Sequence, residues 1–152
     1  MLVKVLKIPQ STKISFLQNN ICLPLKERRR LKNFLFSVFI KKKKQINFLG
    51  FIFCTDDFLL SINQQFLNHD FYTDIITFDL STNKDTIIAE AYISLDRVRE
   101  NALLENSTLQ KELHRVIFHG VLHLCGYKDK GKLAKANMRK MENKLLNQYF
   151  KK

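Results

Sequence analysis

One segment, from Thr108 to Cys125, restricts the possible folds of this chain more than any other. Its apolar residues recur at helical spacing, which predicts an amphipathic helix with one face buried in a core. His119 and His123 are four residues apart beside that face, so their imidazoles project from the same side of the helix. We therefore expect a central helix that carries two imidazoles near its carboxyl end. The apolar face comprises Leu113, Val116, Ile117, Gly120, Val121 and Leu124.

The residues after His123 supply a third candidate ligand. Gly126 can adopt a positive φ and end the helix, and the chain can then bring Asp129 back toward the two imidazoles. Two histidines and one carboxylate leave a fourth zinc position for water, which is typical of a catalytic rather than a structural site. We predict one Zn²⁺ per chain at His119, His123 and Asp129, although this donor set also suits other first-row divalent ions.

Two alternatives apply to this segment. Cys125 lies between His123 and Asp129 and could compete as a thiolate ligand, but a buried apolar role is the better prediction for it. A zinc protease of the H-E-x-x-H type needs a glutamate after the first histidine as general base. The chain has Gly120 there, which argues against peptide hydrolysis by that mechanism.

The run HGVLHLCGYKD, residues 119–129, resembles the motif H-G-x-L-H-L-x-G-Y-D-H of the YbeY family of bacterial rRNA-maturation endoribonucleases. Upstream, INQQFLNHDFYTDIITF (62–78) resembles the family segment L-N-x-x-(F/Y)-R-x-x-D-x-x-T-(D/N)-V-L-S-F, and AYISLDRVRENA is a weaker match. The chain departs from the family twice. Asp129 stands where the family usually has a third histidine, and Leu67 stands where it has an arginine.

The resemblance implies a metal-dependent, single-strand-directed endoribonuclease with a metal-bound water as nucleophile. It also implies a role in rRNA maturation, at the 3′ end of the small-subunit rRNA precursor, and in ribosome quality control. The implied partners are the small ribosomal subunit, a ribosomal protein and an assembly GTPase. The alternative is a non-catalytic, RNA-binding ribosome assembly factor with a structural metal, which the loss of a cation at Leu67 would favour.

Net charge points to a polyanionic partner. The chain has 26 Lys+Arg against 14 Asp+Glu, a formal charge of +12, which favours RNA over a membrane surface, with a merely solvated basic surface as the alternative. Lys128 and Lys130 flank Asp129 and are predicted RNA contacts. Arg115, one turn before His119, is predicted to contact a phosphate; pairing with Glu112 or Glu105 is the alternative. The run 41–44, four lysines, is either a solvated loop or a contact with the RNA backbone.

The remaining polar candidates have weaker predictions. His69 is expected to be a loop histidine, with a hydrogen bond to a metal ligand or a contact with RNA as the alternatives, and His114 lies off the line of ligands. Asp74 is expected either to accept a ligand's N–H or to cap the start of a strand.

Length and composition predict one α+β domain over residues 1–152, with a mixed sheet of about four strands, about five helices and the metal site at the end of a central helix. An odd cysteine count without CxxC fits a reducing cytoplasm. Residues 1–10 lack signal-peptide features, and the apolar run 34–40 is too short to span a bilayer. The predicted strands are 13–17, 46–54, 74–79 and 86–94, and the predicted helices are 25–40, 55–66, 96–106, 108–125 and 132–149.

Overall fold

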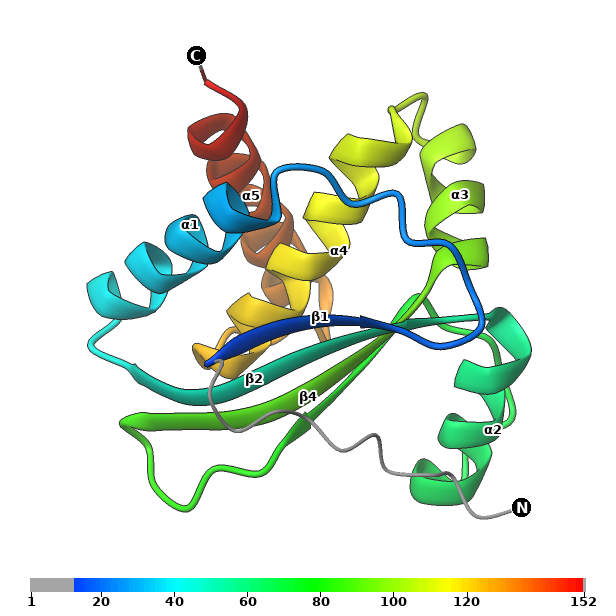
Figure 1. Ribbon diagram of the computed structural model, residues 1–152, viewed down its shortest axis with the longest axis horizontal. Helices are drawn as coiled ribbons and strands as arrows, with labels where there is room; N and C mark the ends of the chain where they lie inside the picture. Colours follow the sequence, from blue (N-terminus) through cyan, green and yellow to red (C-terminus); the bar gives the residue numbers. More distant parts are fainter. Residues whose placement is uncertain (1–12, 152) are drawn as a thin grey trace.

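A computed structural model describes residues 13–151, which form a single α+β domain (Figure 1). The prediction made for residues 1–10 therefore lies outside the described residues. Within 13–151 there are four strands and five helices, as expected. In chain order they are β1 (Ile14–Gln18), α1 (Arg28–Lys41), β2 (Gln45–Cys54), α2 (Asp56–Leu67), β3 (Ile75–Asp79), β4 (Thr86–Ser94), α3 (Leu95–Leu104), α4 (Leu109–Leu124) and α5 (Lys132–Phe150).

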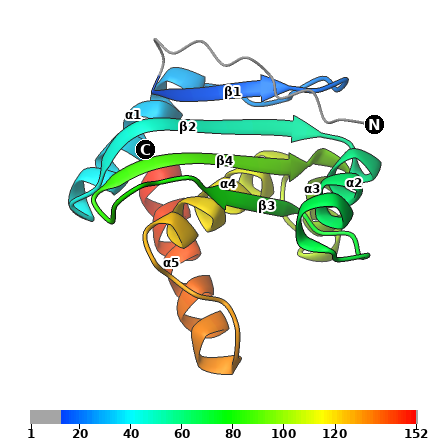
Figure 2. The ribbon, with the colours of Figure 1, turned by 90° about the horizontal axis from the view of Figure 1, so that it is seen from below.

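The strands form one mixed sheet in the order β1-β2-β4-β3, which Figure 2 shows from below. β1 and β4 both run parallel to β2, whereas β3 pairs antiparallel with β4 through the polar turn 80–85. Residues 49–54 of β2 are all buried, as expected for an inner strand covered on both faces. β3 is left at one edge of the sheet, next to the candidate site.

Helices α1, α3, α4 and α5 lie on one face of the sheet, while α2 lies at one end (Figure 1). Successive side chains of β3 point to opposite faces of the sheet and pack in different apolar clusters. Ile75 belongs to the large core under α4, whereas Ile76 packs in a smaller cluster with Leu59 and Ile62 of α2. The predicted apolar face of α4 is buried along its whole length, so α4 is the central helix of the domain.

Helix starts follow the capping chemistry of the sequence. Thr55, Ser94 and Thr108 each accept a hydrogen bond from the backbone N–H three residues later, which fixes the starts of α2, α3 and α4. The start predicted for α1 was three residues too early. Glu27 adopts φ 49° just before Arg28, and the preceding Leu25 is buried in the core instead of extending the helix.

Gly120 allows α4 to approach the edge strand closely. A Cβ built at this position would lie 2.7 Å from Cδ1 of Ile75 and 3.3 Å from Oγ1 of Thr77, both on β3. A larger residue would therefore require the side chain of Ile75 to move or α4 to shift. The neighbouring His119 and the following His123 are thereby held beside β3. Among residues 13–151, no helix combines the length and the hydropathy that a membrane crossing needs.

Candidate metal centre

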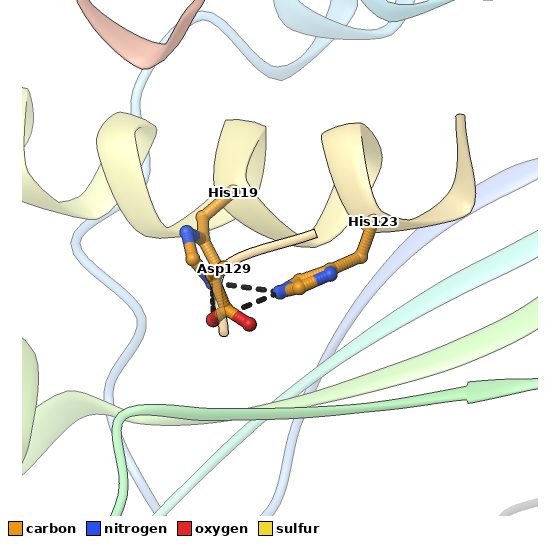
Figure 3. A group of neighbouring side chains, drawn as sticks. All are labelled: His119, His123 and Asp129. Carbon is orange, nitrogen blue, oxygen red and sulfur yellow. Dashed lines mark hydrogen bonds and ion pairs between the residues drawn. The ribbon is translucent and has the colours of Figure 1, made fainter. Parts of the chain in front are cut away.

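His119, His123 and Asp129 converge at the carboxyl end of α4 (Figure 3). The two Nε2 atoms are 3.0 Å apart. Oδ2 of Asp129 lies 3.4 Å from Nε2 of His119 and 3.3 Å from Nε2 of His123. Three atoms that can each offer a lone pair thus face one point. The structure brings together all three residues that the sequence predicted as ligands.

The turn after α4 carries Asp129 back to the histidines. Gly126 has φ 93°, and its N–H donates to the carbonyl of His123 while the N–H of Tyr127 donates to the carbonyl of Leu122. This pair of hydrogen bonds is a Schellman motif, which requires the left-handed residue that glycine provides. The expectation that Gly126 ends the helix with a positive φ is confirmed.

The spacing of the three donor atoms fits a small tetrahedral ion. Zinc lies about 2.0–2.2 Å from nitrogen and carboxylate ligands, so neighbouring ligand atoms around it are about 3.3–3.5 Å apart. The two separations that involve Asp129 match this value, and the separation of the two Nε2 atoms is slightly shorter. Two imidazoles and one carboxylate also leave room for a further ligand, because both histidines and Asp129 are only partly buried.

Glu142 of α5 belongs to the candidate site, and the sequence analysis did not predict it. Its Oε1 lies 2.5 Å from Nδ1 of His119, and its side chain is almost completely buried. A carboxylate can only accept, so Nδ1 carries the proton and the lone pair of neutral His119 is on Nε2, toward the other donors. One signal could have revealed Glu142: it occupies the buried stripe of α5, between Met138 and Leu145.

Arg115 is held by two carboxylates. Its Nε donates to Glu112 at 2.9 Å and its Nη1 to Glu142 at 3.1 Å, while Nη2 also donates to Glu112. Glu112 is one of the partners expected if Arg115 were structural; the other, Glu105, pairs with Arg139 instead. The phosphate contact of Arg115 stays a prediction, and its guanidinium is already engaged by Glu112 and Glu142.

Neighbouring charged side chains shift the pKa values of His119 and Glu142. Burial lowers the pKa of His119, but the hydrogen bond to Glu142 and the charges of Glu142, Asp74 and Asp129 outweigh it and raise that pKa above its ordinary value. Burial raises the pKa of Glu142, but His119 and Arg115 outweigh it and hold the pKa below its usual range. The surroundings of His119 therefore favour a positive charge at Nε2, as a cation site requires.

A cleft of about 520 Å³ opens in front of the three donors. Its walls are the end of α4, the strand β3 and the α2–β3 loop (68–74). The cleft falls within the size range of small-ligand sites in proteins. Among its lining residues are His119, His123, Asp129, Lys130, Leu67, His69, Phe71 and Asp74.

The other predicted residues divide between the cleft and the surroundings. Lys130 lines the cleft, whereas Lys128 is exposed outside it. Leu67 does line the cleft, so the arginine missing at this position would have faced the candidate site. Asp74 was expected to accept from a ligand or to cap a strand, and its carboxylate accepts from Nδ2 of Asn101 at 3.1 Å. The carboxylate that accepts from the candidate ligand His119 is that of Glu142.

Three further predictions concern groups outside the cleft. His114 is buried and stacks on Tyr149, away from the donor atoms, as expected. Cys125 is not among the converging donors, and burial raises the pKa of its thiol to about 11, which fits the apolar role. In the lysine run, Lys42 donates to the hydroxyl of Tyr127 at 2.6 Å and Lys44 to the carbonyl of Lys84.

The fold and the site define a class of protein: an α+β domain with a His–His–carboxylate group in an open cleft beside an edge strand. Comparison with known proteins narrows that class. The family model described as Endoribonuclease YbeY matches residues 13–150. Endoribonuclease YbeY of Cytophaga hutchinsonii is 46% identical over 134 residues, covering 88% of this chain and 94% of that protein. Endoribonuclease YbeY of Porphyromonas gingivalis strain W83 is also 46% identical, covering 88% of each chain.

A solved structure agrees with these sequence matches. A protein of Thermotoga maritima, determined in solution, superposes with a TM-score of 0.60 at 30% identity over 90% of this chain and 89% of that one. The chain belongs to the YbeY endoribonuclease family. The resemblance predicted from the two motifs is therefore confirmed.

Proposed function

We propose that this chain is a metal-dependent endoribonuclease that cuts single-stranded RNA in its cleft. The observation that carries the proposal is the convergence of His119, His123 and Asp129 at the spacing of zinc ligands, within a cleft that also holds Lys130. Membership of an endoribonuclease family supports RNA as the substrate. A formal charge of +12 supports a polyanionic ligand in general.

The residues of the cleft would divide the work. His119, His123 and Asp129 would hold the ion, which would supply an activated water at neutral pH and polarise a phosphoryl oxygen. Glu142 keeps the proton of His119 on Nδ1 and thereby directs Nε2 toward the ion. Lys130, on the cleft wall, would bind a phosphate of the RNA backbone.

The finer assignment rests on the family resemblance. We propose that the substrate is the 3′ end of the small-subunit rRNA precursor and that the protein acts in rRNA maturation and ribosome quality control in the cytoplasm. The small ribosomal subunit, a ribosomal protein and an assembly GTPase are the proposed partners.

Leu67 keeps a second candidate function open. This apolar residue lines the cleft at the position where the family has an arginine, so a cation that could assist cleavage is missing there. A non-catalytic assembly factor would bind RNA through the same basic surface and use the metal to stabilise its fold. Such a protein would bind RNA equally well with and without metal, and would not cut it.

RNA cleavage by the zinc-loaded protein tests the proposal. We expect the native chain to cut single-stranded precursor RNA, Asp129→Ala to lose this activity, and a matched duplex to resist cleavage. Asp85→Ala is the control, because Asp85 lies exposed in the turn between β3 and β4 and lacks a place in the cleft. RNA binding without cleavage by the loaded native protein would instead favour the assembly factor.

A further inference from the structure

The α2–β3 loop places two aromatic rings on the wall of the cleft that faces the donor atoms. The imidazole of His69 and the ring of Phe71 are stacked, with centroids 5.1 Å apart and planes at 23°. Both residues are exposed and both line the cleft that contains His119 and Asp129. We call His69 and Phe71 the ring shelf.

Phe71 differs from the other exposed aromatic residues nearby in what its ring contacts. The ring of Phe66 packs edge-on against Phe78, and the ring of Tyr72 lies beneath the guanidinium of Arg97. Within residues 13–151, the ring of Phe71 stacks on His69 and on no other aromatic ring. Phe71 as a residue is 56% exposed in the cleft, so part of its apolar surface is available to a ligand.

The backbone beneath the ring shelf is fixed by a buried side chain. Asn63 of α2 is 1% exposed, and its Nδ2 donates to the carbonyl of Phe71 at 2.9 Å. The backbone carbonyl of Asn63 also accepts from the N–H of His69 at 3.2 Å. Asn63 thus holds both shelf residues in place while their rings point outward. A shelf that is ordered before binding loses little conformational entropy when a ligand stacks on it.

We propose that the ring shelf stacks a nucleobase of single-stranded RNA and so contributes the preference for unpaired substrate. This inference rests on the proposed function for the identity of its ligand. Unpaired bases expose a flat π-face to aromatic side chains, whereas bases within a duplex are already stacked on one another. Lys130 lines the same cleft and can hold the neighbouring phosphate. Stacking accepts every base, so the shelf selects for single strands rather than for sequence.

Binding of a labelled RNA to the full chain tests the shelf apart from catalysis. The probe is a ten-nucleotide single strand with 2-aminopurine at its centre, in EDTA so that cleavage cannot remove it. We expect Phe71→Ala to weaken binding by between about fivefold and about 150-fold, as for other base–aromatic stacks, and to abolish quenching of the 2-aminopurine. Phe71→Trp should restore both. Affinity for a hairpin of the same sequence should not change.

Phe66→Ala is the matched control. Phe66 is 55% exposed, almost the same as Phe71, and lies in the same part of the chain, but its ring packs on Phe78 and does not line the cleft. Its removal should change affinity less than twofold. Lys130→Ala should lower the slope of log affinity against log salt by about one, whereas Phe71→Ala should leave that slope unchanged.

The outcomes separate this inference from the proposed function. Unchanged affinity and quenching in Phe71→Ala would overturn the ring shelf, even if the zinc-loaded protein cuts RNA. Absence of measurable binding of the single-stranded probe to the native chain would overturn it as well. Stacking that depends on Phe71 in a protein without cleavage would support the shelf and contradict the endoribonuclease assignment instead.

Discussion

The α4 wall of the cleft is held by buried charge pairs, whereas the loop wall is held by backbone hydrogen bonds and leaves its rings exposed. On the α4 side, Glu112 and Glu142 are each 2% exposed and share the guanidinium of Arg115. On the loop side, Asn63 binds the backbone of His69 and Phe71. The ion pairs on the α4 side hold individual side-chain atoms in place. The hydrogen bonds on the loop side hold the backbone in place and leave the rings exposed.

This difference matches what each wall would have to do under the proposed function. Ligand atoms must be placed to within a few tenths of an ångström for an ion to be held, and a buried, fully paired network provides that precision. A stacking surface tolerates small shifts, so ordered backbone with free side chains is sufficient. Changes to the α4 wall should therefore affect stability and metal binding, and changes to the loop wall should affect RNA binding.

The largest effect is expected from Arg115→Ala. This change leaves Glu112 and Glu142 buried without their shared cation, which should cost about 3–5 kcal/mol of unfolding free energy in urea titrations. The control is Arg99→Ala, because Arg99 pairs with Asp96 in an exposed ion pair whose loss should cost less than about 1 kcal/mol. Normal stability of Arg115→Ala with weakened RNA binding would show that Arg115 contacts phosphate instead.

The next largest effect is expected from Glu142→Gln, which tests whether the α4 wall controls zinc affinity. The amide keeps the size of Glu142 but loses the charge that favours a cation at His119, so zinc affinity should fall about 10–100-fold. Competition with a chromophoric chelator measures this. Glu105→Gln is the control, because Glu105 is an exposed partner of Arg139 and its change should leave zinc affinity as it is. Equal affinities in the two variants would mean that Glu142 has no influence on the site.

His114 is buried in the core and should make the stability of the fold sensitive to acid. Burial lowers its pKa, and this effect outweighs the hydrogen bond to the carbonyl of Gln110, which raises that pKa. The unfolded chain therefore binds a proton near pH 6.5 that the folded chain rejects, and stability is lost as pH falls below that value. The slope from this residue reaches at most about 1.4 kcal/mol per pH unit.

Comparison of urea unfolding at pH 8 and pH 5 isolates this contribution. His114→Phe keeps an aromatic ring against Tyr149 and should lose less stability between these two pH values than the native chain does. An identical loss in both proteins would show that acid sensitivity comes from other groups.

Two glycines with nearly the same φ provide the smallest test. Gly126 has φ 93° and Gly131 has φ 91°, and a Cβ at either would meet nothing within 4 Å. Alanine should therefore destabilise both through backbone strain alone, by about 1–2 kcal/mol at Gly126 and by about 1–3 kcal/mol at Gly131, whose ψ of 157° at this φ is essentially restricted to glycine. Only Gly126 sits in the turn between His123 and Asp129, so only Gly126→Ala should also weaken zinc binding in the chelator assay. Equal zinc affinities of Gly126→Ala and Gly131→Ala would show that the turn at Gly126 does not position Asp129 for zinc binding.

The sequence predicted most of the fold because its signals are local. Every strand and helix within residues 13–151 was expected, since apolar periodicity and the capping residues Thr55 and Thr108 act over a few positions. The start of α1 was missed because a glutamate at position 27 gives no indication that the backbone there has a positive φ. A glutamate rarely adopts this conformation, and here it accompanies the burial of Leu25 in the core.

The site was predictable to the same extent. His119, His123 and Asp129 lie within eleven residues, so helical spacing and one glycine turn were enough to bring them together. Glu142 is 23 residues beyond His119, and its contact depends on how α5 packs against α4. Likewise, nothing in the spacing of Phe71 shows that its loop faces the cleft. Residues that act through tertiary packing could be found only in the structure.

Metal content of the purified protein tests the central claim most directly. Native chain, His123→Ala and His69→Ala should be compared, because His69 lines the same cleft but is not among the three converging donors. We predict about one zinc per chain in the native protein and in His69→Ala, and loss of that zinc in His123→Ala. Stoichiometric zinc retained by His123→Ala, or its absence from the native protein, would contradict the assignment of the site.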